Sequence, residues 1–99
     1  MPAIDHAAMH LQASAGQPLT IALESTPGAG VVWQLPAAPA GCRLREAGSV
    51  PGGAGIGGSA TQHFVLTCDQ AGERRLCFEL KRPWESELRA VQPVVVSVT

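Results

Sequence analysis

The chain has 99 residues, of which 45% are hydrophobic and only 15% are charged, and its formal net charge is −1. This length suits one domain with a modest core, and the low charge excludes a disordered chain. The composition also lacks the basic footprint of nucleic-acid binding, and no apolar run is long enough to cross a bilayer. We therefore expect residues 1–99 to form a single monomeric domain that binds neither nucleic acid nor membrane.

Alternation of apolar and polar residues with a period of two dominates the sequence and predicts half-buried strands. No segment has the period of an amphipathic helix. Residues 69–72, Asp-Gln-Ala-Gly, separate two alternating runs and are predicted to form a hairpin turn. In chain order, the predicted strands cover residues 8–11, 19–24, 31–35, 42–45, 64–68, 76–81 and 94–99.

The segments between these strands are rich in glycine and proline, notably residues 25–30, 36–41 and 48–59. About seven short strands with such turn signals are typical of an immunoglobulin-like sandwich. The Cys…Trp…Cys pattern of antibody domains is absent, so a related topology is expected. We predict an all-β fold, an immunoglobulin-like antiparallel β-sandwich, with Trp33 in its core.

Three loops carry distinctive residues. The first is Ser-Thr-Pro-Gly-Ala-Gly at 25–30, the second contains Gly-Ile-Gly-Gly at 55–58, and the third is Arg-Pro-Trp-Glu at 82–85. Loops after the second, fourth and sixth strands of such a sandwich can emerge at one end, as in variable domains. Proline stiffens the tip of the third loop, and Trp and Arg are frequent binding anchors. The three loops therefore predict a binding surface.

Taken together, the three motifs resemble the chagasin-like inhibitors of papain-family cysteine proteases. That family has Asn-Pro-Thr-Thr-Gly-x-x-Trp, then Gly-x-Gly-Gly before a Phe-containing strand, then Arg-Pro-Trp. This chain has TPGAGVVW, GIGG before QHF, and RPWE in the same order. Each motif alone is weak, but the ordered triple is specific. Thr26 stands where the family has Asn, and Gly28 and Ala29 replace the two threonines, so their hydroxyls are missing.

The resemblance implies a reversible inhibitor that occupies the active-site cleft of a papain-family cysteine protease. The first loop would lie over the catalytic Cys–His pair, the second would run beside the cleft like an added strand, and the third would contact the primed side. The resemblance implies no cofactor. The protease-binding residues that it implies are Thr26, Pro27, Gly28, Ala29 and Gly30, then Gly55, Ile56, Gly57 and Gly58, and finally Arg82, Pro83 and Trp84.

The alternative is an immunoglobulin-like binding module with a non-protease partner, which would use Trp84 but not the first loop. An enzyme has no supporting constellation, because neither a Ser–His–Asp arrangement nor a carboxylate pair is indicated. His6, His10 and His63 share no metal-ligand spacing with a cysteine, so we expect no metal and no catalytic residue.

The three cysteines are an odd number without regular spacing, which argues against a disulfide framework. Cys68 falls on an apolar strand face and is expected to be a small buried hydrophobe. Cys77 falls on the opposite face, so a bridge between these two is not expected, and Cys42 is ambiguous. The first residues lack the features of a signal peptide. The expected compartment is the cytoplasm, or the periplasm or extracellular space if a leader has been removed.

Overall fold

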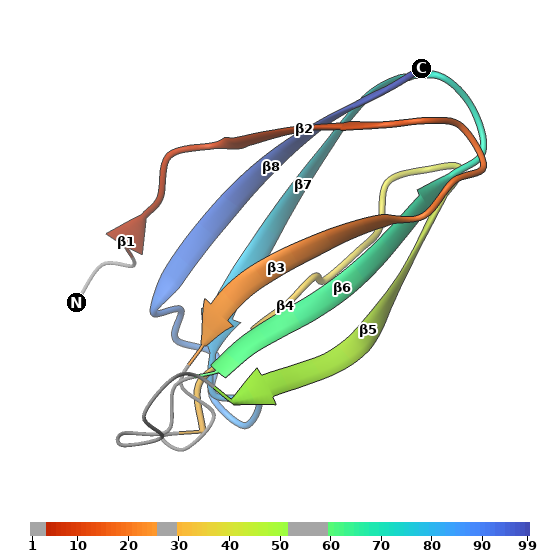
Figure 1. The fold of residues 1–99 in the computed structure, drawn as a ribbon. Coiled ribbons are helices and arrows are strands. Elements are labelled where there is room, and N and C mark those ends of the chain that lie inside the picture. The colour runs from red at the N-terminus through yellow and green to blue at the C-terminus, as the bar shows by residue number, and fades with distance from the viewer. Residues whose placement is uncertain (1–3, 26–29, 52–59) are drawn as a thin grey trace.

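The computed structural model describes residues 4–25, 30–51 and 60–99 (Figure 1). These residues form eight strands and no helix, so they contain no helix that could cross a membrane. Seven of the strands correspond to the predicted ones, and the eighth, β1, has only two residues. The strands are β1 (Ile4–Asp5), β2 (Met9–Ala13), β3 (Leu19–Ser25), β4 (Val32–Gln34), β5 (Cys42–Pro51), β6 (Ala60–Cys68), β7 (Gly72–Lys81) and β8 (Ala90–Val98).

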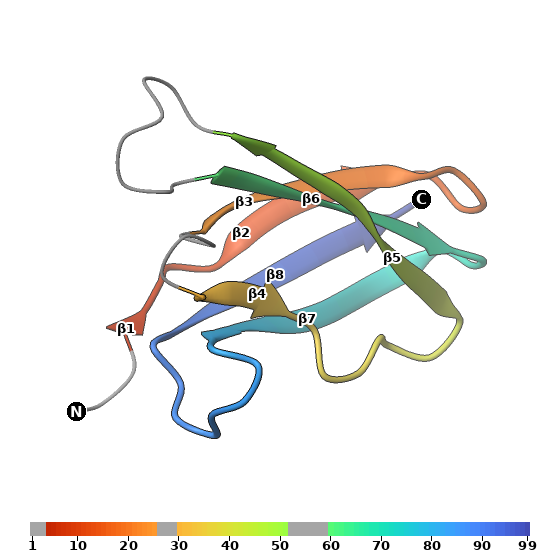
Figure 2. The same cartoon turned by 90° about the horizontal axis from the view of Figure 1, so that it is seen from below.

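Two sheets pack face to face, as the edge-on view in Figure 2 shows. One sheet has the antiparallel order β3-β6-β5. In the other sheet, β7 lies between β8 and β4 and is antiparallel to both, while β1 and β2 add to β8 in parallel. The predicted all-β, immunoglobulin-like antiparallel sandwich is therefore confirmed.

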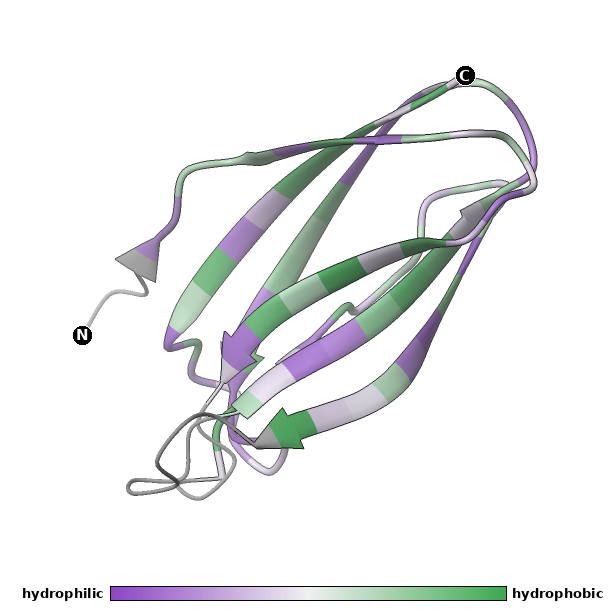
Figure 3. Ribbon diagram, in the orientation of Figure 1, coloured by the Kyte–Doolittle hydropathy of each residue, from purple (hydrophilic) through white to green (hydrophobic). Residues whose placement is uncertain are grey.

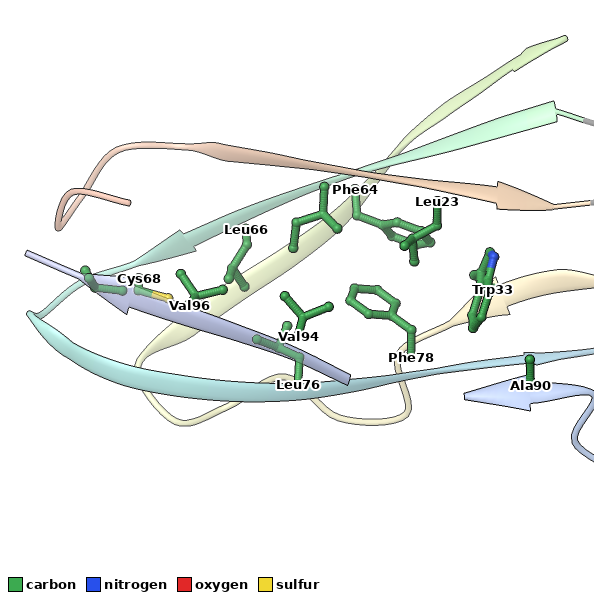
Figure 4. Packing of buried hydrophobic residues seen from close by; sticks show 12 residues of the cluster. Leu23, Trp33, Phe64, Leu66, Cys68, Leu76, Phe78, Ala90, Val94 and Val96 are labelled. Atoms are coloured by element: carbon green, nitrogen blue, oxygen red, sulfur yellow. The ribbon is translucent and has the colours of Figure 1, made fainter. Parts of the chain in front are cut away.

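The core lies between the sheets and contains every second residue of the central strands. In β6 and β8 buried residues alternate with half-buried or exposed ones. In β3 the same alternation of burial appears as bands of higher and lower hydropathy along the ribbon (Figure 3). Phe64 and Phe78 meet at the centre with ring centroids 5.0 Å apart (Figure 4). Burial of one such side chain stabilises the fold by about 1.5–3 kcal/mol. Trp33 is only 5% exposed, which confirms its predicted place in the core.

The predicted hairpin turn at residues 69–72 is wrong. The strands on either side, β6 and β7, belong to different sheets. Both edges of β6 are already paired, with β3 and with β5, so β7 cannot pair with it and joins β8 and β4 instead. The short connection therefore passes from one layer to the other, and alternation in the flanking strands could not distinguish this crossing from a hairpin.

The argument against a disulfide framework is also wrong for one pair of cysteines. Cys42 and Cys68 lie directly opposite each other in the register of β5 and β6 and are bonded to each other. Cys68 is therefore buried as half of a disulfide and not as a free thiol. The two cysteines are 26 residues apart, and no spacing in the sequence indicates that they are partners. Cys77 is a free, exposed cysteine, so the expected absence of a Cys68–Cys77 bridge is confirmed.

Candidate functional site

The strand ends that flank the first and second loops lie side by side in the three-stranded sheet. Ser25, the last residue of β3, pairs with Ala60, the first residue of β6. Ala60 also pairs with Pro51, the last residue of β5. The first loop, which leaves at Ser25, and the second loop, which connects Pro51 to Ala60, therefore start at the same end of this sheet.

The other sheet presents the third loop at this same end, the lower left of the sandwich in Figure 1. Lys81, at the end of β7, pairs with Val32, where β4 begins after the first loop. Leu80 pairs with Ala90, so the third loop returns directly into β8. We call this end of the sandwich, where the flanks of all three loops meet, the loop end.

The third loop is a hydrogen-bonded β-turn. The Glu85 N–H donates to the Arg82 carbonyl at 3.0 Å, which places Pro83 and Trp84 at the two corners of the turn. Among the described residues only glycines have positive φ, so the turn is of type I, in which proline is favoured at the first corner. Trp84 is 73% exposed, which is exceptional for so large an apolar side chain. The turn thus holds an indole outward into solvent.

Charged side chains brace this turn from within the loop. The Arg82 guanidinium donates to Glu85 Oε1 at 3.0 Å. Nη2 of Arg89 lies 4.0 Å from the other carboxylate oxygen, Glu85 Oε2. The backbone N–H of Arg89 donates to the Leu80 carbonyl at 2.7 Å. This bond closes the base of the connection between β7 and β8, which contains the third loop. These ion pairs are partly exposed and each contributes about 0–1 kcal/mol to stability. Their main effect is on the shape of the loop.

The first loop meets the third through Gly30. A β-carbon added to Gly30 would lie 2.8 Å from Cη2 of Trp84, so the indole is packed against the glycine backbone. The structure therefore brings together two predicted site residues from loops that are far apart in the sequence.

Eight of the predicted site residues lie outside the described residues, so their placement stays a prediction. Their loops are anchored on strands that end at Ser25 and Pro51 and on the segments that begin at Gly30 and Ala60. These eight residues are Thr26, Pro27, Gly28 and Ala29 in the first loop and Gly55, Ile56, Gly57 and Gly58 in the second.

The sequence analysis missed a buried amide that connects the two sheets beneath these loops. The Trp33 N–H donates to Gln62 Oε1 at 2.7 Å, and Gln62 Nε2 donates to the Trp33 carbonyl at 3.4 Å. The Trp33 indole N–H donates to the Glu24 carbonyl at 2.6 Å and thereby joins the strands on both sides of the first loop. The sequence contains a signal for this contact, because Gln62 is a polar residue at a position of β6 that faces the core.

Two more buried polar side chains lie near the loop end. Gln92 Nε2 donates to the Ala7 carbonyl at 2.8 Å and holds the N-terminal segment against β8. Ser25 Oγ is buried at the root of the first loop and has no hydrogen-bond partner among the described residues. In the described residues, the core therefore changes from apolar to polar where it approaches the three loops.

The described residues contain no cluster of His, Cys, Asp or Glu able to hold a metal. What they present at the loop end is a stiff protruding aromatic and hydrogen-bonded strand ends. The fold and this end together define an immunoglobulin-like β-sandwich that exposes a large aromatic side chain at one end. The family model described as chagasin family peptidase inhibitor I42 matches residues 12–98. The chain therefore belongs to the chagasin family, a family of peptidase inhibitors and not of enzymes, which confirms the resemblance in the three motifs.

No curated protein matches the chain, but solved structures share its fold. Amebosin has 21% sequence identity and a TM-score of 0.68, with complete coverage of both chains. The cysteine protease inhibitor EhICP2 from Entamoeba histolytica has 16% identity and a TM-score of 0.66 over 99% of this chain and 94% of its own. PbICP-C, solved in complex with falcipain-2, has 16% identity and a TM-score of 0.67 over 99% of this chain and 92% of its own. Likeness at these identities establishes the fold.

Proposed function

We propose that this chain is a reversible inhibitor of papain-family cysteine proteases and that its loop end occupies the active-site cleft. The observation that carries the proposal is the exposed indole of Trp84, which a braced turn holds against Gly30 beside the flanks of the other two loops. Membership of a peptidase-inhibitor family supports it. So do two neighbours in fold, one named as a cysteine protease inhibitor and one solved in complex with falcipain-2.

The physical basis is the binding of a preformed convex surface in a narrow cleft. A stiff turn loses little conformational entropy on docking, so more of the contact energy appears as affinity. Trp84 supplies a large, rigid contact area that is already in water and ready to be buried. The loops block the cleft without presenting a well-positioned scissile bond, so inhibition is reversible.

In this proposal residues 1–99 act as one inhibitor domain, and each loop has a separate role. The first loop covers the catalytic Cys–His pair, the second runs beside the cleft, and the third places Trp84 on the primed side. Gly28 and Ala29 lack the hydroxyls that the family pattern has at these positions. Trp84 therefore carries a larger share of the binding energy here than the family pattern suggests.

The experiment is a titration of several papain-family proteases with the protein and with its Trp84→Ala variant. We expect inhibition constants in the nanomolar-to-micromolar range, about −12 to −8 kcal/mol. Removal of an anchor of this kind weakens binding by about 2 kcal/mol or more, roughly 30-fold. Gln70→Ala, at the opposite end of the sandwich, is the control and leaves inhibition unchanged.

Absence of inhibition at high micromolar protein, against every protease tried, would contradict the proposal. It would favour the alternative of an immunoglobulin-like module with a non-protease partner. If inhibition is present but equal in the wild type and the Trp84→Ala variant, the assignment of the third loop is wrong.

A further inference from the structure

Gly30 differs from the other glycines of positive φ that the structure describes. Gly16, Gly41 and Gly48 have nothing within 4 Å of the position that a β-carbon would take. Gly72 has only the flexible end of Arg74 near it. At Gly30, by contrast, the neighbour is the rigid indole of Trp84, with Cη2 at 2.8 Å. Here a side chain is excluded by an aromatic ring as well as by the backbone φ of +80°.

The distances also show how the ring approaches. Behind Cη2, the two adjoining ring atoms Cζ2 and Cζ3 lie 3.5 and 3.7 Å from the same position. The vertex of the six-membered ring therefore points at Gly30, and the faces of the indole are not covered by this glycine. Since Trp84 is 73% exposed, most of its surface stays available to a partner despite this contact.

Within the third loop, the hydrogen bond of the turn and the Arg82–Glu85 ion pair fix the backbone that carries Trp84. The indole is a partner in neither of them. An exposed tryptophan on such a turn would still sample several rotamers, and their loss on binding reduces affinity. The contact with Gly30 supplies a constraint on the side chain itself.

From these contacts we infer that Gly30 is a positioning residue for Trp84, so that the first loop sets the orientation of the indole that the third loop carries. The inference rests on the proposed function for its effect on inhibition. The contact itself is a property of the free protein. Gly30 acts here through Trp84 and not by touching the protease.

The first test is made on the free protein by NMR. We expect a nuclear Overhauser effect between Hη2 of Trp84 and the α-protons of Gly30. We also expect the Gly30 α-proton shifts to change in Trp84→Ala, because the ring current is removed. Absence of the Overhauser effect, together with rotamer-averaged couplings at Trp84, would overturn the inference whatever the protein inhibits.

The second test is a double-mutant cycle on the inhibition constant. Gly30→Ala displaces the indole, and we expect it to raise the inhibition constant about three- to tenfold. In the Trp84→Ala background the same change should alter it by less than about twofold, because the group that Gly30 positions is gone. Equal effects in both backgrounds would show that Gly30 acts within the first loop, and would overturn the inference.

Gly41→Ala is the matched control. Its φ of +74° imposes nearly the same backbone strain as the +80° of Gly30, but a β-carbon there meets nothing within 4 Å. Gly41→Ala should lower stability as Gly30→Ala does and leave the inhibition constant within about twofold of the wild type. If no variant and no wild-type protein inhibits any protease, the proposed function fails, and the NMR test alone decides the role of Gly30.

Discussion

At the scale of single residues, Gln62 determines how the loop end is held together. Its side chain is 2% exposed, yet it satisfies both the N–H and the carbonyl of Trp33 in the opposite sheet. A buried backbone group without a partner costs about 1–3 kcal/mol, so this amide does more than fill space. It connects β6, which follows the second loop, to β4, which follows the first.

We predict that Gln62→Leu lowers the free energy of unfolding by about 1–3 kcal/mol, because it leaves the Trp33 backbone unpaired in the core. Urea denaturation measures this change. Gln12→Leu, on an exposed position of β2, is the control and should change stability by less than about 0.5 kcal/mol. Equal effects of the two substitutions would show that the Gln62 hydrogen bonds contribute nothing.

Sequence reasoning succeeded for residues whose role follows from strand alternation and failed for contacts between sheets. Trp33 was placed in the core because it falls within a strand pattern, and Trp84 was placed outside because a proline turn carries it. The pairing of Trp33 with Gln62 depends on how two sheets stack. Alternation predicts on which face of its sheet a residue lies. It does not predict which residue of the other sheet that residue contacts.

At the scale of elements, the third loop is a turn whose shape is set before binding. Pro83 occupies the first corner, where its restricted φ matches a type I turn. The Arg82–Glu85 ion pair then closes the turn from its two ends. In the proposed function, this element contributes rigidity to binding.

Replacement of Pro83 by alanine tests this rigidity. We expect Pro83→Ala to lower stability by about 0.4–1 kcal/mol through the entropy of the unfolded chain. It should also raise the inhibition constant by about two- to fivefold, because the free turn becomes looser. Pro36→Ala, in an exposed connection between β4 and β5, should have a similar effect on stability and none on inhibition. A Pro83→Ala protein that inhibits as well as the wild type would show that preorganisation of this turn is unimportant.

Strand identities were predictable, whereas the pairing of strands was not. The seven predicted strands all exist, but β6 and β7 belong to different sheets. β5 also extends past its predicted end at residue 45 and ends at Pro51. The extension includes an irregularity between Glu46 and Ser49, with Gly48 at φ +101°. A bulge of this kind interrupts the alternation from which the end of a strand is predicted.

At the scale of the whole molecule, the two ends of the sandwich are built differently. The loop end has buried polar groups and exposed Trp84, whereas the Cys42–Cys68 disulfide joins β5 and β6 at the opposite end. In Figure 4 Cys68 lies toward one end of the core, and Trp33 and Ala90 lie toward the other. Covalent stabilisation is therefore separated from the proposed binding surface by the length of the strands.

This separation predicts that the disulfide supports stability and not inhibition. Replacement of both Cys42 and Cys68 by serine should lower the free energy of unfolding by about 2–4 kcal/mol, as measured in urea. Inhibition by the remaining folded protein should be unchanged. The wild type should also show a single reactive thiol in a thiol assay, that of Cys77. Three reactive thiols in the native protein would contradict the disulfide.

The most direct test of the central claim, that the loop end enters the protease cleft, is an NMR titration of the isotope-labelled protein with an inactivated papain-family protease. The account predicts that amide signals of Gly30, Ala60 and Trp84 shift or broaden on binding. Signals of Gly41, Cys68 and Gln70, at the opposite end, should stay in place. Perturbations centred on the opposite end, or on the outer face of either sheet, would contradict the account.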